Sequence, residues 1–122
     1  MLFRSNDNLD KSKPVTGAKV YDIYCRACHQ KDGKGDGLRF PPLDNSEWVR
    51  GDKKRLIRVL LNGLEGTIEV KGKPYNSLMP SQSFLTDEEI AQVLTYVRQN
   101  FENDASEVSA GEVSKLRDGK NK

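Results

Sequence analysis

The sequence predicts an all-α domain with three main helices and a short fourth helix toward the C-terminus. Two stretches, 52–62 and 86–101, carry apolar residues at three- and four-residue steps, the period of an amphipathic helix. Only Thr67-Ile68-Glu69-Val70 alternates as a strand does. The 122 residues suffice for one domain, but only 35% are hydrophobic and the mean hydropathy is −0.73. Because a chain this polar should struggle to bury a large side-chain core, we expect another group to fill its centre.

Composition excludes several classes of protein. The net charge is +2, from 20 basic and 18 acidic residues, which is too balanced to favour nucleic acid. No run approaches the ~20 apolar residues that a membrane span needs, and no internal repeat is present. Met1 to Pro14 lacks the apolar core of a secretory signal. Either a signal has been removed or the chain is a domain of a longer protein, and the sequence does not separate the two.

Three segments follow from these patterns. We expect a polar N-terminal arm over 1–14, one domain over 15–103, and a charged C-terminal extension over 104–122. The extension contains Ser109-Ala110-Gly111-Glu112, a capping box that predicts one or two helical turns ending near Leu116.

The first helix of the domain is expected to begin at Thr16, a residue suited to the N-cap. Gly17 indicates either a helix start or a close contact with another element. The residues that recur at helical steps are Ala18, Tyr21, Tyr24, Cys25 and Cys28. This spacing predicts two to three turns that deliver both cysteines to one side.

The next segment is expected to be irregular. Asp32-Gly33-Lys34-Gly35-Asp36-Gly37 fails as a calcium loop, because a Lys holds the third position and Leu43 the twelfth, so we interpret it as a polar turn. Phe40-Pro41-Pro42-Leu43 should be extended, since two prolines remove backbone donors. Leu43 and Trp48 are candidates to cover an apolar surface.

The remaining elements have clear boundaries. A helix over 52–62 ends at Asn62-Gly63, and a short hairpin or extended excursion follows over 67–75. The last main helix begins with the capping box Thr86-Asp87-Glu88-Glu89 and runs to about Phe101.

The chemistry of the chain concentrates in Cys25-Arg26-Ala27-Cys28-His29, which holds both cysteines and the single histidine. C-x-x-C-H is the attachment motif of c-type haem. Two thiols at this spacing can each form a thioether to one porphyrin, and the adjacent imidazole can then bind the iron. A structural zinc site would need a fourth ligand, a redox dithiol would need a βαβ context, and a disulfide would leave His29 unexplained.

Met79 is the candidate for the second axial ligand. Counting excludes a second histidine, and Met1 is terminal. Met79 lies in the irregular stretch Asn76-Ser77-Leu78-Met79-Pro80 and belongs to no helical stripe, which favours a ligand over a methionine that fills a core gap.

Over residues 15–101 the chain resembles the class I monohaem c-type cytochromes. The matching features are Gly17-x-x-x-Tyr21, Cys25-x-x-Cys28-His29, Pro41-x-Leu43, Met79-Pro80 and the amphipathic last helix. The stretch Leu61 to Pro80 is similar to cytochrome c modules fused to or partnering bacterial dehydrogenases and copper nitrite reductases. The resemblance implies a cytochrome c fold around one haem c bound covalently through Cys25 and Cys28.

The same resemblance implies specific contacts. Gly17 and Tyr21 should meet the region of Val93, Tyr96 and Val97, and the Pro41 carbonyl should accept a hydrogen bond from His29. Leu43, Trp48, Leu56, Leu60, Leu78 and Tyr75 are expected to pack on the haem. Arg39, Arg50 and Trp48 are candidates for its propionates, with a solvated surface role equally open for the two arginines.

The function expected is one-electron transfer by a His29/Met79-ligated haem, as a carrier or redox module and not as an enzyme. With both axial positions filled, no small-molecule substrate is expected at the iron. The alternative is a haem-based gas sensor with a labile Met79; a peroxidase is disfavoured because no second histidine is present. The partner is expected to be a redox protein, for which the basic residues of 50–58 are either a docking patch or a solvated helix face. The resemblance implies a periplasmic location, free or through a membrane tether outside this chain.

Overall fold

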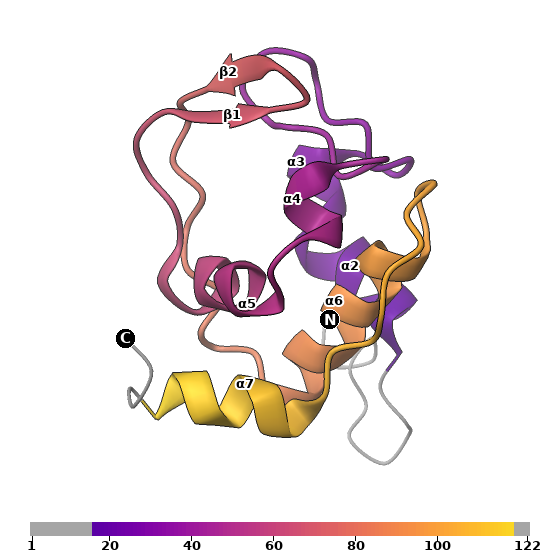
Figure 1. Ribbon diagram of the computed structural model, residues 1–122, viewed down its shortest axis with the longest axis vertical. Helices are drawn as coiled ribbons and strands as arrows, with labels where there is room; N and C mark the ends of the chain where they lie inside the picture. The colour runs from indigo at the N-terminus through magenta and orange to yellow at the C-terminus, as the bar shows by residue number, and fades with distance from the viewer. Residues whose placement is uncertain (1–15, 119–122) are drawn as a thin grey trace, which may run out of the picture.

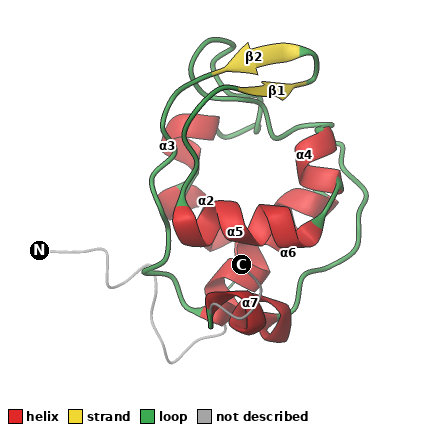
Figure 2. Ribbon diagram, turned by 60° about the vertical axis from the view of Figure 1, so that its left-hand side comes forward, coloured by secondary structure: helices red, strands yellow, loops and turns green. Residues whose placement is uncertain are grey.

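The computed structural model describes residues 16–118, as a mostly helical domain with one small hairpin (Figure 1). The arm expected over 1–14 and the last residues of the expected extension lie outside this range. The helices are α2 (Gly17–Tyr24), α3 (Arg26–His29), α4 (Glu47–Arg50), α5 (Lys53–Asn62), α6 (Asp87–Gln99) and α7 (Ala110–Arg117). The strands are β1 (Ile68–Val70) and β2 (Lys73–Tyr75). Helices α2, α5, α6 and α7 gather at one end of the molecule, and the hairpin and neighbouring loops lie at the other (Figures 1 and 2).

The contact between α2 and α6 is the tightest in the helical end, as the resemblance implied. A Cβ added to Gly17 would lie 2.2 Å from the Gln92 carbonyl oxygen and 2.6 Å from the Tyr96 Cβ. Only glycine therefore allows this approach. One turn further on, the ring of Tyr21 lies 5.8 Å from that of Tyr96 and 5.2 Å from that of Phe101.

The first helix differs from its prediction in two respects. Helix α2 ends at Tyr24 and a separate turn, α3, carries Cys28 and His29, so the cysteines do not share one continuous helix. Val20 is buried whereas Ala18 is exposed, because the side of α2 that includes Gly17 faces α6. The predicted N-cap is confirmed: the Thr16 side chain accepts a hydrogen bond from the Lys19 N–H.

Two further helices, α5 and α4, pack against α6. Helix α5 begins after Asp52, whose side chain caps it, and its five buried residues are Leu56, Ile57, Val59, Leu60 and Leu61. The single turn α4 was not predicted; it begins where Ser46 accepts hydrogen bonds from the N–H groups of Trp48 and Val49. The fully buried Val49 of α4 joins the same core as α5 and α6.

The hairpin confirms the expected excursion. Strands β1 and β2 pair antiparallel, with Ile68 opposite Tyr75 and Val70 opposite Lys73. Lys71 and Gly72 turn the chain with φ of 53° and 79°, the two positive values that a tight two-residue hairpin turn requires.

The last two helices confirm both capping boxes. Thr86 exchanges hydrogen bonds with Glu89 at the start of α6, and Ser109 does the same with Glu112 at the start of α7. Helix α7 packs against α5 and α6 through the fully buried Val113. No helix within residues 16–118 has the length and apolar character needed to cross a membrane.

Candidate haem site

An apolar cavity lies between the helical end and the hairpin end. Its volume is about 710 Å³ including the open mouth. The residues that line it are Tyr21, Cys25, His29, Pro41, Pro42, Leu43, Ser46, Trp48, Val49, Leu56, Val59, Leu60, Leu64, Ile68, Val70, Met79, Val93, Leu94 and Val97. A smaller pocket adjoins it and shares His29, Pro41, Leu64, Ile68 and Met79 with it.

The His29 ring is fixed by a hydrogen bond at one of its two nitrogens. The imidazole is buried, and its Nδ1 lies 3.0 Å from the carbonyl oxygen of Pro41. Because that oxygen can only accept, Nδ1 carries the proton and the lone pair of Nε2 is left for another partner. Burial lowers the pKa of His29, although the Pro41 hydrogen bond opposes this shift. The ring is therefore neutral at pH 7, the form that binds metals.

The two cysteines flank this histidine and are not joined to each other. Cys25 lines the main cavity, and Cys28 lines the smaller pocket beside it. Burial, with a smaller contribution from Cys28, raises the pKa of a free Cys25 thiol to about 12. One cysteine thus lies at the main cavity and the other at the pocket beside it, both on the same short stretch of chain as His29.

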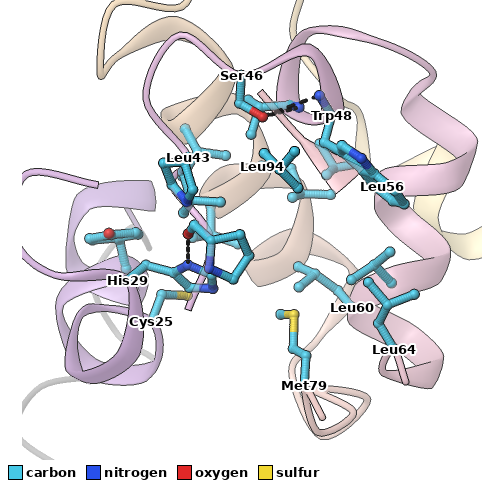
Figure 3. Close-up of a pocket in the computed structure, with 18 of the residues that line it drawn as sticks. Cys25, His29, Leu43, Ser46, Trp48, Leu56, Leu60, Leu64, Met79 and Leu94 are labelled. Atoms are coloured by element: carbon cyan, nitrogen blue, oxygen red, sulfur yellow. Dashed lines mark hydrogen bonds between the residues drawn. The ribbon is translucent and has the colours of Figure 1, made fainter. Parts of the chain in front are cut away.

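Met79 points into the cavity from a different wall, as Figure 3 shows together with His29. Its backbone N–H donates to the Leu64 carbonyl at 2.8 Å, and its carbonyl accepts from the Leu64 N–H at 2.9 Å. Gly63 leaves room for this bridge, since a Cβ there would lie 2.7 Å from the Met79 oxygen. The thioether is therefore carried by a backbone that is fixed to the end of α5.

The other predicted site residues also surround the cavity. Leu43 and Trp48 line the main cavity, and the buried Tyr75 lines the smaller pocket. Trp48 Nε1 donates to the Glu69 carbonyl at 2.9 Å, so this group is already used within the protein. Arg39 lines the smaller pocket. Arg50, in contrast, donates to Asn45 and Asn103 and lines neither pocket.

The contact of Leu78 with the haem stays a prediction. Leu78 borders the smaller pocket, but 65% of its surface is exposed. The extended bridge to Leu64 explains this, because neighbouring side chains on an extended backbone point to opposite sides. Met79 takes the inward position and leaves Leu78 outside.

Several lining residues were not singled out from the sequence as contacts of the cavity: Val59, Leu64, Ile68, Val93, Leu94 and Val97. For the helical ones the signal was present. Val59 follows Leu56 by three positions on α5, and Val97 follows Val93 by four on α6, so each shares a face with a neighbour. Leu64 and Ile68 lie on irregular or short extended chain, where no period marks them.

Comparisons with known proteins agree with this geometry. A model of the cytochrome c family matches residues 14–101. The chain is 45% identical over 111 residues to cytochrome c-552 of Thermus thermophilus, covering 83% of this chain and 83% of that protein.

Longer proteins also contain a similar segment. The fructose dehydrogenase cytochrome subunit of Gluconobacter japonicus is 35% identical over 124 residues, which cover 95% of this chain and 24% of that subunit. The cytochrome c subunit of the quinone alcohol dehydrogenase of Gluconobacter oxydans is 35% identical over 105 residues, which cover 83% of this chain and 22% of that subunit.

The residues present fit a covalently bound haem. A large apolar cavity suits a flat porphyrin, and two unpaired cysteine sulfurs lie at its edge beside a neutral imidazole with one free nitrogen. The group also supplies the missing centre that the polar composition predicted. The chain therefore belongs to the cytochrome c family, and it is an electron-transfer module, not an enzyme, that carries haem c through Cys25 and Cys28.

Proposed function

We propose that His29 and Met79 bind the haem iron from its two sides, so that the module carries single electrons with no open coordination position. The observation that supports this most directly is that both side chains enter one apolar cavity and that Pro41 engages the other nitrogen of His29. When bound, the haem supplies a one-electron ferric/ferrous couple.

The surrounding residues set how readily that electron is held. The Pro41 carbonyl fixes the plane of the His29 ring and makes the imidazole a better donor. A thioether such as that of Met79 stabilises the ferrous state and raises the reduction potential. Leu56, Leu60 and Leu94 line the cavity with hydrocarbon, which disfavours the additional charge of the ferric state. The Met79 thioether and the hydrocarbon lining therefore raise the reduction potential, whereas the Pro41 hydrogen bond lowers it.

Displacement of Met79 by a gas, the alternative function, has less support. Both backbone groups of Met79 are paired with Leu64, and Ser81 Oγ and the Gln82 N–H donate to carbonyls of α5 shortly afterwards. Because the backbone around Met79 is held by these hydrogen bonds, the Met79 thioether should rarely leave the iron. Such a site favours a carrier over a sensor.

An absorption spectrum of the holoprotein, with and without carbon monoxide, tests this ligation. We expect a low-spin reduced spectrum that carbon monoxide changes only slowly, and a weak red sulfur-to-iron charge-transfer band when oxidised. In Met79→Ala the red band should vanish, the potential should fall and carbon monoxide should bind. Leu38→Ala changes an exposed leucine that lines neither pocket and serves as the matched control. A Met79→Ala protein with the wild-type spectrum and potential would contradict the assignment.

The physiological partner is proposed to be a redox protein with an acidic docking surface. Relatives are named as cytochrome subunits of dehydrogenases, and the segment over 50–58 is strongly basic. Part of that charge has partners within the chain: Arg55 stacks over Trp48 at 3.8 Å, and Lys53 pairs with Glu112 at 3.6 Å. The exposed Lys54 is therefore the residue to change.

Stopped-flow reduction by a cytochrome-linked dehydrogenase measures this steering. Lys54→Glu should slow the bimolecular rate at low salt, and the difference should shrink as ionic strength rises. If Lys54→Glu and the wild type are reduced at the same rate at every ionic strength, the segment is an ordinary solvated helix face and not a docking patch.

The periplasmic side of a membrane is the proposed location, because the family resemblance connects covalent haem attachment with export. Expression with and without an added export signal tests it. Only the exported chain should acquire covalent haem, which a haem stain on a denaturing gel detects. Equal staining of the chain kept in the cytoplasm would contradict the proposal.

A further inference from the structure

Arg117, the last residue of α7, contacts the chain that follows Met79. Its Nη1 donates to the Ser83 carbonyl at 2.9 Å, and its Nη2 donates to the Leu85 carbonyl at 2.7 Å. Its Nε donates to Oδ1 of Asp87 at 2.6 Å. One guanidinium thus contacts two carbonyls of the segment that joins Met79 to α6 and the side chain of the first residue of α6.

Helix α5 holds the same segment at other residues. The Gln82 N–H donates to the Leu60 carbonyl at 2.6 Å, and Ser81 Oγ donates to the Leu61 carbonyl at 2.8 Å. Residues 80–86 form no helix or strand, so these side contacts replace regular structure. The position of the segment depends on α5 and Arg117 together.

The geometry suits an arginine specifically. A planar guanidinium presents its N–H groups as a fork that meets two carbonyls and a carboxylate at once, whereas a lysine ammonium is a single point charge. The side chains of Arg117 and Asp87 are each about one-third exposed, so solvent weakens the attraction between their charges. The two carbonyl contacts therefore contribute most of the orientation.

We propose that Arg117 is a positioning residue for Met79: by fixing the segment after Met79, it holds the thioether toward the iron. The inference rests on the proposed His29/Met79 ligation. Without the guanidinium, the carbonyls of Ser83 and Leu85 lose these hydrogen bonds, and the segment can move away from α5. Met79 then leaves the iron more often, and an external ligand enters.

The experiment compares holoprotein variants by two readouts. Together they distinguish a loss of Met79 ligation from a general loss of stability. The first is the rate of carbon monoxide binding to the reduced protein. The second is the temperature at which the red charge-transfer band disappears, relative to the temperature at which the far-ultraviolet helix signal is lost. Lys53→Gln is the matched control, because it removes another ion pair of α7, that of Lys53 with Glu112, without touching residues 83–87.

In Arg117→Ala, carbon monoxide binding should accelerate about fivefold, and the red band should disappear well before the helices unfold. Arg117→Lys should behave similarly because it lacks the fork, and Asp87→Asn should have a smaller effect because both carbonyl contacts remain. If Arg117→Ala does not fold, these two variants carry the test. Lys53→Gln should match the wild type in both readouts.

Two results would overturn the inference and are distinguishable. If the band and the helix signal are lost together in every Arg117 variant, with the wild-type carbon monoxide rate, Arg117 only stabilises the fold. If the wild-type protein itself lacks the red band and binds carbon monoxide rapidly, the proposed ligation fails and the role of Arg117 fails with it.

Discussion

The helical end and the loop end of this molecule are held together in different ways. At the helical end, side chains meet directly: Val20 and Ile90 have no exposed surface, and α2 approaches α6 so closely that Gly17 is required. At the loop end, residues 30–46 and 64–80 surround the cavity and expose Leu38 and Leu78 to solvent. The comparison indicates that the helices pack both on one another and on the cavity, whereas the loops, with less packing of their own, should depend more heavily on contact with the haem.

Hydrogen bonds take the place of packing in the loops. The Asp36 carboxylate accepts from the N–H groups of Leu38, Arg39 and Phe40. The Leu43 N–H donates to the Gly33 carbonyl at 2.6 Å. Such bonds define a loop shape but contribute only about 1 kcal/mol each to stability, so the loop end should be the weaker half when the cofactor is missing.

Removal of the two cysteines that attach the haem should have the largest effect on the difference between the two ends. We expect Cys25→Ser/Cys28→Ser to be largely unfolded, losing most of the roughly 5–15 kcal/mol that a domain of this size has. The cavity walls would face water, and the polar composition offers nothing to replace the haem. Far-ultraviolet circular dichroism and the dispersion of the NMR spectrum measure the loss. A well-dispersed spectrum of the double variant would contradict it; Cys28→Ser alone, with one thioether left, is the intermediate control.

Gly17→Val tests the helical end alone. The added Cβ would collide with the Gln92 carbonyl, and we expect a loss of about 3 kcal/mol in denaturant unfolding of the holoprotein. Gly111→Ala is the control of opposite sign: its Cβ would meet only Ser109 Oγ at 3.9 Å, so a gain of about 0.5 kcal/mol is expected. Equal behaviour of the two variants would refute the special contact at Gly17.

Asn103 joins the two ends, and its removal should cost somewhat less than the Gly17 change. Its Nδ2 donates to the carbonyls of Leu43 and Val97, and its Oδ1 accepts from the Ser46 N–H. Asn103→Ala leaves these buried groups without partners, at a cost of about 2 kcal/mol. Asn100→Ala, an exposed neighbour with one hydrogen bond to Tyr96, should stay within about 0.5 kcal/mol. Denaturant unfolding compares them, and similar losses in both would deny Asn103 this linking role.

The smallest effect is expected at Asp44, which ties the loop end together. Burial alone would raise the pKa of Asp44, but hydrogen bonds and charge from Lys34 and Lys71 outweigh it and hold the pKa below its usual 3.8. A lowered pKa means that the stabilisation is present near neutral pH and is lost as the pH falls below about 4. Asp44→Asn should therefore be less stable than the wild type at pH 7, with the difference shrinking in acid. Asp22→Asn, in an exposed pair with Arg26, is the control, and a difference independent of pH would exclude the ion pairs as its cause.

Much of this arrangement could be predicted because its signals are local. The capping boxes at Thr86 and Ser109, the period of α5 and the C-x-x-C-H spacing each need only a few neighbouring residues. The Gly17 contact with Tyr96 and the Pro41 hydrogen bond came from the family resemblance, and the structure confirms both.

Other features had no local signal. The turn α4 is a single turn, too short for a period to mark it. The break between α2 and α3 at Cys25 interrupts a pattern that the sequence continues smoothly. Buried Arg98 donates to the carbonyls of Val49 and Gly51, far away in the sequence. Contacts of this kind depend on the tertiary fold, so the sequence around each partner does not reveal them.

The pairing of α2 with α6 has a consequence for how the chain tolerates change. Because these two helices contact each other, all the chain between them forms one closed loop, which contains the cavity and the hairpin. The entropy of closing such a loop grows only with the logarithm of its length, about 0.6 kcal/mol for each doubling. Extra residues at the hairpin turn of Lys71 and Gly72 would thus cost little loop-closure entropy and leave the contact between α2 and α6 unchanged. The chain between these two helices is therefore the part of the molecule where insertions should be tolerated best.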